Sequence, residues 1–363
     1  MNDQFPKVEG LGILGECTGR SRALKVGELA QCQTLGLHDK QERSPEAEAY
    51  LLELRRQIEE ASPQIAILVG YSYLHHELAK FFKSVETPVV LIELTPQTAT
   101  QGIDPKEISA LIAVALGISV QGSPLIREAG IPYACIGSPH KDRVSRVTLK
   151  PESLGLDSHR PVVSIFPGGR GQDLEKVFPC FWDLAQRLAA DPAFQVVLAL
   201  TSQRDSETTL LIDGKPVTDM APDAPELKGV RILRGIHLEL LSLSQLAITG
   251  GGAVTVECAL FGVPFMPLCA DSAKSEQSFS MLNQIMGKVI VPEYQVGADR
   301  EALYQTALSL IRPGVARDKM LGDMQGVARS LQGYAAENAV EYIGREIAQW
   351  KQSTKKPKGT QTA

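Results

Sequence analysis

Short apolar segments rich in β-branched residues alternate with amphipathic segments along most of the chain. Such apolar runs, bounded by turn residues, are typical of strands buried in a parallel sheet, and the segments between them predict helices on both faces of the sheet. The predicted strands are residues 65–69, 88–92, 111–115, 133–136, 162–166, 196–200, 230–233, 246–249 and 263–267. Because the alternation occurs in both halves, the sequence predicts an α/β protein with two Rossmann-like domains.

The predicted domain boundary is the polar segment 150–160, which contains Pro151 and Gly155 and directly precedes a strong predicted strand. A final amphipathic segment predicts a helix that packs back on the N-terminal domain or on a partner, and the basic segment after it predicts a disordered tail. The predicted divisions are an N-terminal domain at 1–155, a C-terminal domain at 156–334, the final helix at 335–350 and the tail at 351–363.

The composition fits two globular domains and argues against several other classes of protein. Of 363 residues, 44% are hydrophobic and 22% are charged, and the net charge of −5 with 6% aromatic residues argues against a nucleic-acid partner. No apolar run is long enough to span a bilayer, and the first residues lack the pattern of a signal peptide, so we expect a cytoplasmic protein. None of the six cysteines forms a CxxC pair, so we expect no metal site.

The first candidate site is a glycine-rich turn at residues 167–171, which read Pro-Gly-Gly-Arg-Gly between a predicted strand and a predicted helix. Gly168 and Gly169 allow backbone N–H groups at the helix start to approach a phosphate closely. The guanidinium of Arg170 can add a bidentate contact to a diphosphate. The alternative is an ordinary tight turn, but the arginine inside the turn favours an anion site.

The second candidate site is another turn between a predicted strand and a predicted helix, formed by Gly250, Gly251 and Gly252. Thr255 is a candidate donor to a phosphate, and the carboxylate of Glu257, about one helical turn farther on, suits the two donors of a ribose diol. The alternative is a glycine turn with an incidental surface glutamate. Two such loops in one Rossmann-like domain favour a nucleotide site, because ligands bind beyond the carboxyl ends of parallel strands.

The third candidate element, residues 283–293, reads Asn-Gln-Ile-Met-Gly-Lys-Val-Ile-Val-Pro-Glu. Asn283 and Gln284 offer donors and acceptors that suit sugar hydroxyls or a uracil edge. On its own the segment is typical of a loop before a strand.

Together these three elements resemble the lipid-A-disaccharide synthase family of GT-B glycosyltransferases. Residues 166–170 read Phe-Pro-Gly-Gly-Arg where the family has Leu-Pro-Gly-Ser-Arg, and residues 250–257 are a looser match to its Ser-Gly-Thr-x-Thr-Leu-Glu. Residues 283–293 fit its Asn-x-x-x-Gly-[Arg/Lys]-x-x-x-Pro-Glu pattern and are the most specific match. The first half resembles the family more weakly.

The resemblance implies a GT-B fold with two Rossmann-like domains that face a cleft, and a hexosyltransferase reaction. The family transfers 2,3-diacylglucosamine from UDP-2,3-diacylglucosamine to lipid X, with release of UDP and without a metal cofactor. Carried over to this chain, Arg170 would bind the diphosphate, Glu257 would hold the ribose, and Asn283 would lie near the donor sugar or phosphate. The resemblance also implies a homodimer in peripheral contact with the inner membrane of a Gram-negative bacterium.

The acceptor side departs from the family. The family's candidate base is an aspartate after the strand that matches residues 65–69, whereas residues 71–76 here read Tyr-Ser-Tyr-Leu-His-His. Imidazole titrates near neutral pH, so His75 and His76 are candidate bases. The alternative, which we favour, is a histidine pair at the surface.

Three hypotheses remain open from the sequence. The first is an active lipid-A-disaccharide synthase with an altered acceptor side. The second is a UDP-sugar glycosyltransferase with another acceptor, and the third is a catalytically impaired homologue that binds a UDP-sugar for regulation.

Overall fold

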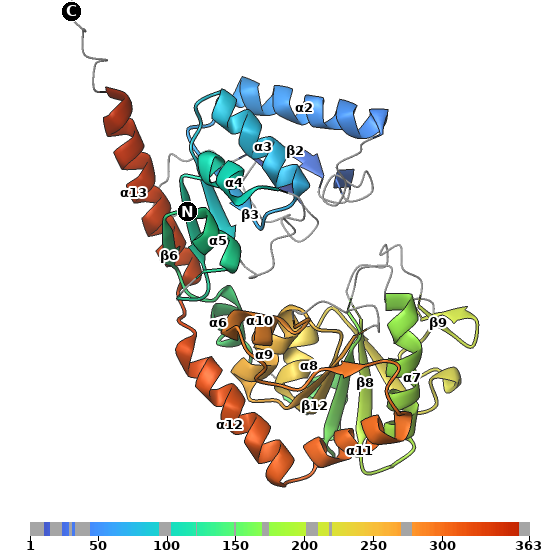
Figure 1. The fold of residues 1–363 in the computed structure, drawn as a ribbon. Coiled ribbons are helices and arrows are strands. Elements are labelled where there is room, and N and C mark those ends of the chain that lie inside the picture. The colour runs from blue at the N-terminus through green and yellow to red at the C-terminus, as the bar shows by residue number, and fades with distance from the viewer. Residues whose placement is uncertain are drawn as a thin grey trace, which may run out of the picture. The chain divides into compact units, whose positions relative to one another are not determined.

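The structure is a computed structural model, shown in Figure 1. It describes residues 11–14, 24–28, 31–32, 44–93, 103–120, 122–148, 150–168, 174–200, 210–217, 220–269 and 278–355. The chain divides into two compact units. Unit 1 contains Met1–Pro139 and Gln332–Ala363, and unit 2 contains His140–Leu331.

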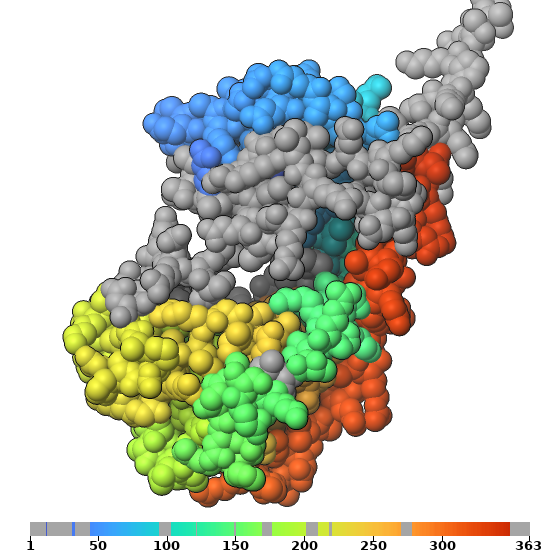
Figure 2. All heavy atoms as spheres, turned by 180° about the vertical axis from the view of Figure 1, so that it is seen from behind, coloured from blue at the N-terminus to red at the C-terminus, as the bar shows by residue number. Residues whose placement is uncertain are grey.

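The second unit begins earlier in the chain than the predicted boundary at residue 155. The segment 140–160, green in Figure 2, lies on the surface of unit 2. Lys141 fixes this segment there, because its Nζ donates to the carbonyl oxygen of Leu331 at 2.6 Å. Arg231 does the same farther along, with a 2.6 Å hydrogen bond from Nη1 to the carbonyl oxygen of Gly155.

Unit 2 contains a six-stranded parallel sheet with strand order β11-β8-β7-β12-β13-β14. The chain passes from β7 through β8 to β11 at one edge, and then crosses back to β12 and proceeds through β13 to β14 at the other. The neighbours β7 and β12 therefore form the point at which the direction of winding reverses. The strands are β7 Val162–Phe166, β8 Gln195–Leu200, β11 Val230–Arg234, β12 Ser244–Thr249, β13 Phe265–Cys269 and β14 Tyr294–Gln295.

Helices flank this sheet in Figure 1, as the sequence predicted. They are α6 Pro139–Val144, α7 Leu174–Ala189, α8 His237–Ser242, α9 Ala253–Phe261, α10 Met281–Met286, α11 Arg300–Ile311 and α12 Val315–Ser330, with 3-10 turns at Pro151–Leu154 and Pro225–Leu227. A two-stranded antiparallel hairpin, β9 Leu211–Ile212 with β10 Lys215–Pro216, lies apart from the main sheet.

Unit 1 contains a four-stranded parallel sheet in the order β3-β4-β5-β6 and a separate pair of parallel strands, β1 and β2. The strands are β1 Leu11–Leu14, β2 Leu24–Glu28, β3 Ala66–Val69, β4 Val89–Glu93, β5 Val114–Gly117 and β6 Tyr133–Cys135. The helices are α2 Pro45–Ala61, α3 Tyr73–Ser84, α4 Pro105–Leu111 and α5 Pro124–Ala129. The α/β fold class predicted from the sequence is confirmed in both units.

Three helices of unit 1 begin at the same local sequence, a capping side chain followed by proline. Ser44, Asp104 and Ser123 each accept a hydrogen bond from a backbone N–H in the first turn of the helix that they precede. Proline at the next position already has the backbone angle of a helix and lacks an N–H that would need a partner. One predicted boundary near these helices is wrong. The predicted strand at 111–115 begins only at Val114, because Leu111 is still the last residue of α4.

The final helix, α13 Ala335–Lys355, belongs to unit 1. Ala339 and Ile343 pack in one apolar cluster with the sheet residues Val90, Leu116 and Ala134. The helix continues to Lys355 and thus includes the first residues of the segment that we predicted as a disordered tail, while residues 356–363 lie outside the described part. Within the described residues, every helix is too short or too polar to cross a membrane.

Candidate functional site

The two glycine loops lie against each other at the winding reversal of the unit 2 sheet. Thr249 at the end of β12 pairs with Phe166 at the end of β7, so both loops begin at the same level of the sheet. The N–H of Gly250 donates to the carbonyl oxygen of Phe166 at 2.9 Å. A Cβ atom at Gly250 would overlap the carbonyl oxygen of Pro167, so this contact requires glycine.

The side of the loops away from this contact is open. Gly168 and Gly252 have positive φ angles of 101° and 71°, and a Cβ atom at either position would have no heavy-atom neighbour within 4 Å among the described residues. Gly252 is the N-cap of α9, whose first N–H groups lack intrahelical acceptors. The loops therefore present backbone donors and the positive end of a helix at one exposed place, which suits a phosphate group. Gly169 and Arg170, which we predicted to contact it, lie outside the described residues.

Gly251 connects this place to the third element. A Cβ atom at Gly251 would lie 2.8 Å from Cδ2 of Phe279 and 3.1 Å from its carbonyl oxygen. Phe279 immediately precedes Ser280, the N-cap of α10. The second glycine loop is thus supported from behind by the start of α10.

Thr255 is fully buried and serves this support. Its hydroxyl donates to the carbonyl oxygen of Gly252 at 2.7 Å and accepts from the N–H of Leu282 at 3.1 Å. A hydroxyl has a single hydrogen to donate. In this structure that hydrogen is used within the loop, so Thr255 positions the loop, and its contact to a phosphate stays a prediction.

Asn283 is fully engaged within the protein, and its place near the donor stays a prediction. It is 1% exposed, and its Oδ1 accepts from the N–H groups of Ile290 and Val291 at 2.8 and 3.1 Å. Its Nδ2 donates to the carbonyl oxygen of Val291 at 2.9 Å and to Oε1 of Glu293 at 2.8 Å. These four hydrogen bonds use both lone pairs of the amide oxygen and both amide hydrogens, so in this structure none is left for another partner.

Glu293, the last residue of the third motif, completes this structural arrangement. Its two carboxylate oxygens accept from the N–H groups of Phe279 and Ser280 at 3.2 and 3.1 Å. Asn283 and Glu293 therefore fix the N-terminus of α10, which places Phe279 against Gly251. The spacing in the motif thus brings Asn283 and Glu293 together at the start of α10.

Glu257, the predicted ribose ligand, is 2% exposed and faces three cationic or titratable side chains. Nδ1 of His140 lies 3.2 Å from its Oε1, and Nη1 of Arg143 lies 3.6 Å from the same oxygen. Nε2 of His237 lies 3.4 Å from Oε2. Burial alone would raise the pKa of Glu257, but hydrogen bonding to His140 and His237 outweighs burial and lowers this pKa to about 2. Glu257 is thus ionised at neutral pH and is not the incidental surface residue of the alternative interpretation.

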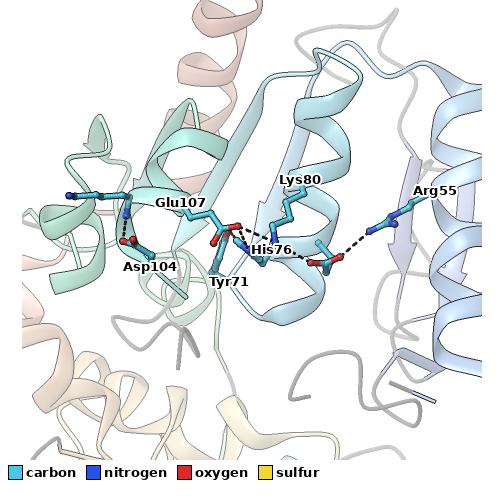
Figure 3. A network of polar contacts seen from close by, with 8 residues as sticks. Arg55, Tyr71, His76, Lys80, Asp104 and Glu107 are labelled. Carbon is cyan, nitrogen blue, oxygen red and sulfur yellow. Dashed lines mark hydrogen bonds and ion pairs between the residues drawn. The ribbon is translucent and has the colours of Figure 1, made fainter. Parts of the chain in front are cut away.

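His75 is occupied at the start of α3, where its Nδ1 accepts from the N–H of Ser72 at 3.1 Å and lies 2.8 Å from the Ser72 hydroxyl oxygen. His76 is 2% exposed, so the favoured interpretation as a surface pair is wrong. Its Nδ1 lies 2.9 Å from the hydroxyl of Tyr71, and its Nε2 lies 3.3 Å from Oε1 of Glu107 (Figure 3). Both ring nitrogens of His76 are engaged, which argues against the predicted role as a base.

His76 belongs to a chain of polar contacts that ties α2, α3 and α4 together (Figure 3). Lys80 lies 3.0 Å from Glu107 and 3.6 Å from Glu77, and Arg55 of α2 lies 3.1 Å from Glu77. The contacts join residues that lie far apart in the sequence, and we interpret the network as structural.

We expect replacement of His76 by glutamine to make unit 1 less sensitive to acid. Burial and the neighbouring Lys80 lower the pKa of His76 below 6.5, despite the opposing effect of Glu107. Because the unfolded chain binds this proton more readily, the contribution of His76 to stability is present above pH 6.5 and is lost as the pH falls through the lower folded pKa. Hydrogen exchange of α3 at pH 5 and pH 7.5 measures the difference. The exposed His159→Gln variant is the control, and an unchanged pH dependence in His76→Gln would contradict the assignment.

The groups around Glu257 could not be predicted from the sequence. His140 and Arg143 lie in α6 and His237 begins α8, so two segments that are distant from Glu257 in the chain meet it only in the folded unit. Glu293 was part of a recognised motif, but its role as an acceptor at the start of α10 depends on the path of the intervening chain.

Comparison with known proteins places the chain among its relatives. A family model described as lipid-A-disaccharide synthetase matches residues 123–272. Lipid-A-disaccharide synthase of Solibacter usitatus is 27% identical over 91% of this chain and 87% of its own length. The enzyme of the same name from Geobacter sulfurreducens is 30% identical over 69% of this chain and 66% of its own length. The crystal structure of MurG from Acinetobacter baumannii covers 91% of this chain and 87% of its own, with a TM-score of 0.53 and 12% identity.

The chain has two α/β units, each built on a parallel sheet, and glycine loops follow the central strands β7 and β12 of the second. These features define a protein with a fold of the GT-B type. The sequence relatives identify its branch more closely. The chain belongs to the lipid-A-disaccharide synthase family. The cleft between the two domains stays a prediction from the sequence.

Proposed function

We propose that this protein is a hexosyltransferase that transfers 2,3-diacylglucosamine from UDP-2,3-diacylglucosamine to lipid X and releases UDP, as its family name indicates. The observation that carries the proposal is the contact of the two glycine loops at the winding reversal of the unit 2 sheet, with exposed donors on their open side. This is the position at which open parallel sheets bind their ligands.

The chemistry required of this site is modest. As the acceptor hydroxyl attacks the anomeric carbon, the bond from that carbon to UDP breaks and the negative charge of the diphosphate grows. A diphosphate bound at Gly252 would meet the backbone N–H groups at the start of α9, and fixed donors of this kind stabilise a transition state without the cost of reorganising water. We therefore propose that the reaction proceeds without a metal cofactor.

A second candidate, a homologue that binds a UDP-sugar without turning it over, is favoured by one specific observation. The acceptor hydroxyl must lose a proton, yet the Nδ1 atom of His75 and both ring nitrogens of His76 are occupied by neighbouring groups. A glycosyltransferase with another acceptor is the third outcome of the same test.

Calorimetry and a turnover assay separate these functions. We expect UDP to bind, and incubation with UDP-2,3-diacylglucosamine and lipid X to yield the disaccharide 1-phosphate, identified by mass, with one UDP released for each product. Binding of UDP without product would favour the impaired homologue, and product only with a different acceptor would favour the third hypothesis. Absence of UDP binding would contradict all three.

The resemblance to the family also supports a cytoplasmic homodimer in peripheral contact with the inner membrane. Light scattering should give twice the 39.3 kDa mass of the chain. Sedimentation with vesicles of bacterial phospholipid should recover the protein in the pellet. A monomer, or a protein that stays in the supernatant, would contradict the respective part of the proposal.

A further inference from the structure

Glu257 and the side chains around it lie at the same edge of the sheet as the glycine loops. Glu257 is the fifth residue of α9, about 6 Å along the helix axis from Ala253 at its start. His237 is the first residue of α8, which follows the carboxyl end of β11. A nucleotide whose diphosphate lies at Gly252 would therefore carry its ribose toward this group of residues.

The three neighbours of Glu257 differ in their access to a ligand. The side chains of His237 and Arg143 are 44% and 52% exposed, whereas that of His140 is only 12% exposed. His140 binds Oε1, and the half-exposed His237 lies beside Oε2. Oε1 thus has two neighbours, His140 and Arg143, whereas Oε2 has only His237 among the described residues.

Among the residues that the structure describes, the cationic or titratable side chains within 4 Å of this carboxylate come from two helices. His140 and Arg143 lie on α6, and His237 lies on α8. Cys258, the next residue of α9, is fully buried, and burial together with Glu257 raises its pKa well above the usual value, so it carries no charge. Neither α10 nor α12, which also contact α9, contributes an ion pair to Glu257 among the residues that the structure describes.

We propose that His140 is a positioning residue for nucleotide recognition: its Nδ1 hydrogen bond holds the buried Glu257 carboxylate in one orientation and keeps it ionised, so that Oε2 can accept from a ribose hydroxyl. The inference rests on the proposed function, because it takes the ligand to be a uridine nucleotide. It adds a residue that does not touch the ligand and that determines how well the site distinguishes ribose from deoxyribose.

The physical reason is the conflict between burial and charge at Glu257. An ionised carboxylate out of water is costly unless donors surround it. Burial is the largest influence on the pKa of Glu257, and it acts toward the neutral acid. Without the hydrogen bond from His140 to Oε1, the largest influence that lowers the pKa of Glu257 is lost, and the carboxyl group takes up a proton at a higher pH and can rotate. A neutral acid in a variable orientation is a weaker and less specific acceptor for a hydroxyl than a fixed carboxylate.

The experiment compares the dissociation constants of UDP and 2′-deoxy-UDP by calorimetry at pH 5.5, 7.0 and 8.5. In the wild-type protein we expect UDP to bind about tenfold more tightly than 2′-deoxy-UDP at every pH, the size of one hydrogen bond to a charged group. In His140→Ala this ratio should fall toward one at pH 5.5 and recover at pH 8.5. The exposed Arg146→Ala variant, on the same segment, should behave as the wild type.

Two further variants separate positioning from general damage to the fold. His140→Asn places an amide N–H close to the position of Nδ1 and should restore a ratio independent of pH. His140→Gln keeps the amide one methylene farther away and should not. Glu257→Gln should show a low ratio at all three pH values, because its amide does not titrate.

Each outcome decides the inference. A ratio in His140→Ala equal to that of the wild type at every pH would overturn it, as would failure of His140→Asn to restore the ratio while His140→Gln does. If the wild-type protein binds UDP and 2′-deoxy-UDP equally, Glu257 does not read the ribose, and the inference fails while donor binding stands. If the wild-type protein binds neither nucleotide, the proposed function fails and the inference falls with it.

Discussion

Replacement of Gly250 by alanine is expected to reduce the affinity for UDP at least 100-fold and to destabilise unit 2. The new Cβ atom would overlap the carbonyl oxygen of Pro167, and this atom belongs to the backbone, so it cannot turn away as a side chain would. Either β12 or the first glycine loop must shift, although β12 is paired with β7 through Thr249 and Phe166. Overpacking of this kind costs about 1–3 kcal/mol in stability, and displacement of the donors removes several hydrogen bonds to the ligand.

Gly262→Ala is the matched control for this prediction. Gly262 ends the same helix, α9, with a φ of 68°, and a Cβ atom there would have no neighbour within 4 Å. Alanine is less stable than glycine in the left-handed backbone conformation of this position, but the glycine loops stay in place. We therefore expect a loss of about 1 kcal/mol in stability and an unchanged affinity for UDP. Calorimetry and urea unfolding measure both quantities. An affinity for UDP in Gly250→Ala that matches that of Gly262→Ala would show that the contact between the loops is unimportant.

The second large effect is expected for Asn283→Asp, which should destabilise unit 2 by about 3–5 kcal/mol. The new side chain keeps an oxygen for the N–H groups of Ile290 and Val291. Its second oxygen replaces the amide donor and faces two acceptors, the carbonyl oxygen of Val291 and the carboxylate of Glu293. An unpaired buried charge beside a carboxylate is among the costliest changes in a protein interior.

Gln305→Glu tests the same change from amide to carboxylate at a solvent-exposed position. The amide of Gln305 also donates to a carboxylate, Oε1 of Glu301 at 2.7 Å, but this pair is exposed on α11. Solvent screens the new repulsion, so we expect a change below about 0.5 kcal/mol. Urea unfolding followed by the fluorescence of Trp182, which lies in α7 of unit 2, compares the two variants. Equal stability of Asn283→Asp and the wild type would contradict the structural role assigned to Asn283.

This role changes how the third family motif is understood. The resemblance to the family implies that Asn283 lies near the donor sugar or phosphate. The structure assigns Asn283 and Glu293 to the start of α10, from which Phe279 supports Gly251. The motif therefore supports the second glycine loop from behind, and we expect its effect on a ligand to be transmitted through that loop.

The parts of the fold that the sequence predicted well are those decided by local physics. The runs at residues 162–166 and 246–249 are β-branched and apolar because both faces of the sheet are covered, and the glycines after them mark the turns. Whether an amide or an imidazole is available to a ligand is a different kind of question. Asn283 and His76 looked available because their partners, Val291, Glu293, Tyr71 and Glu107, are assigned only by the tertiary structure.

Hydrogen exchange with and without UDP tests the central claim most directly, because that claim concerns backbone amides. Saturating UDP should slow exchange both in the peptide that contains Gly168 and in the peptide that contains Gly252. The peptide around Gly262 should exchange as it does without UDP. The protection should be weaker with uridine, which lacks the diphosphate. Binding of UDP without slower exchange in either glycine loop would mean that the phosphate lies elsewhere, and would contradict the account given for unit 2.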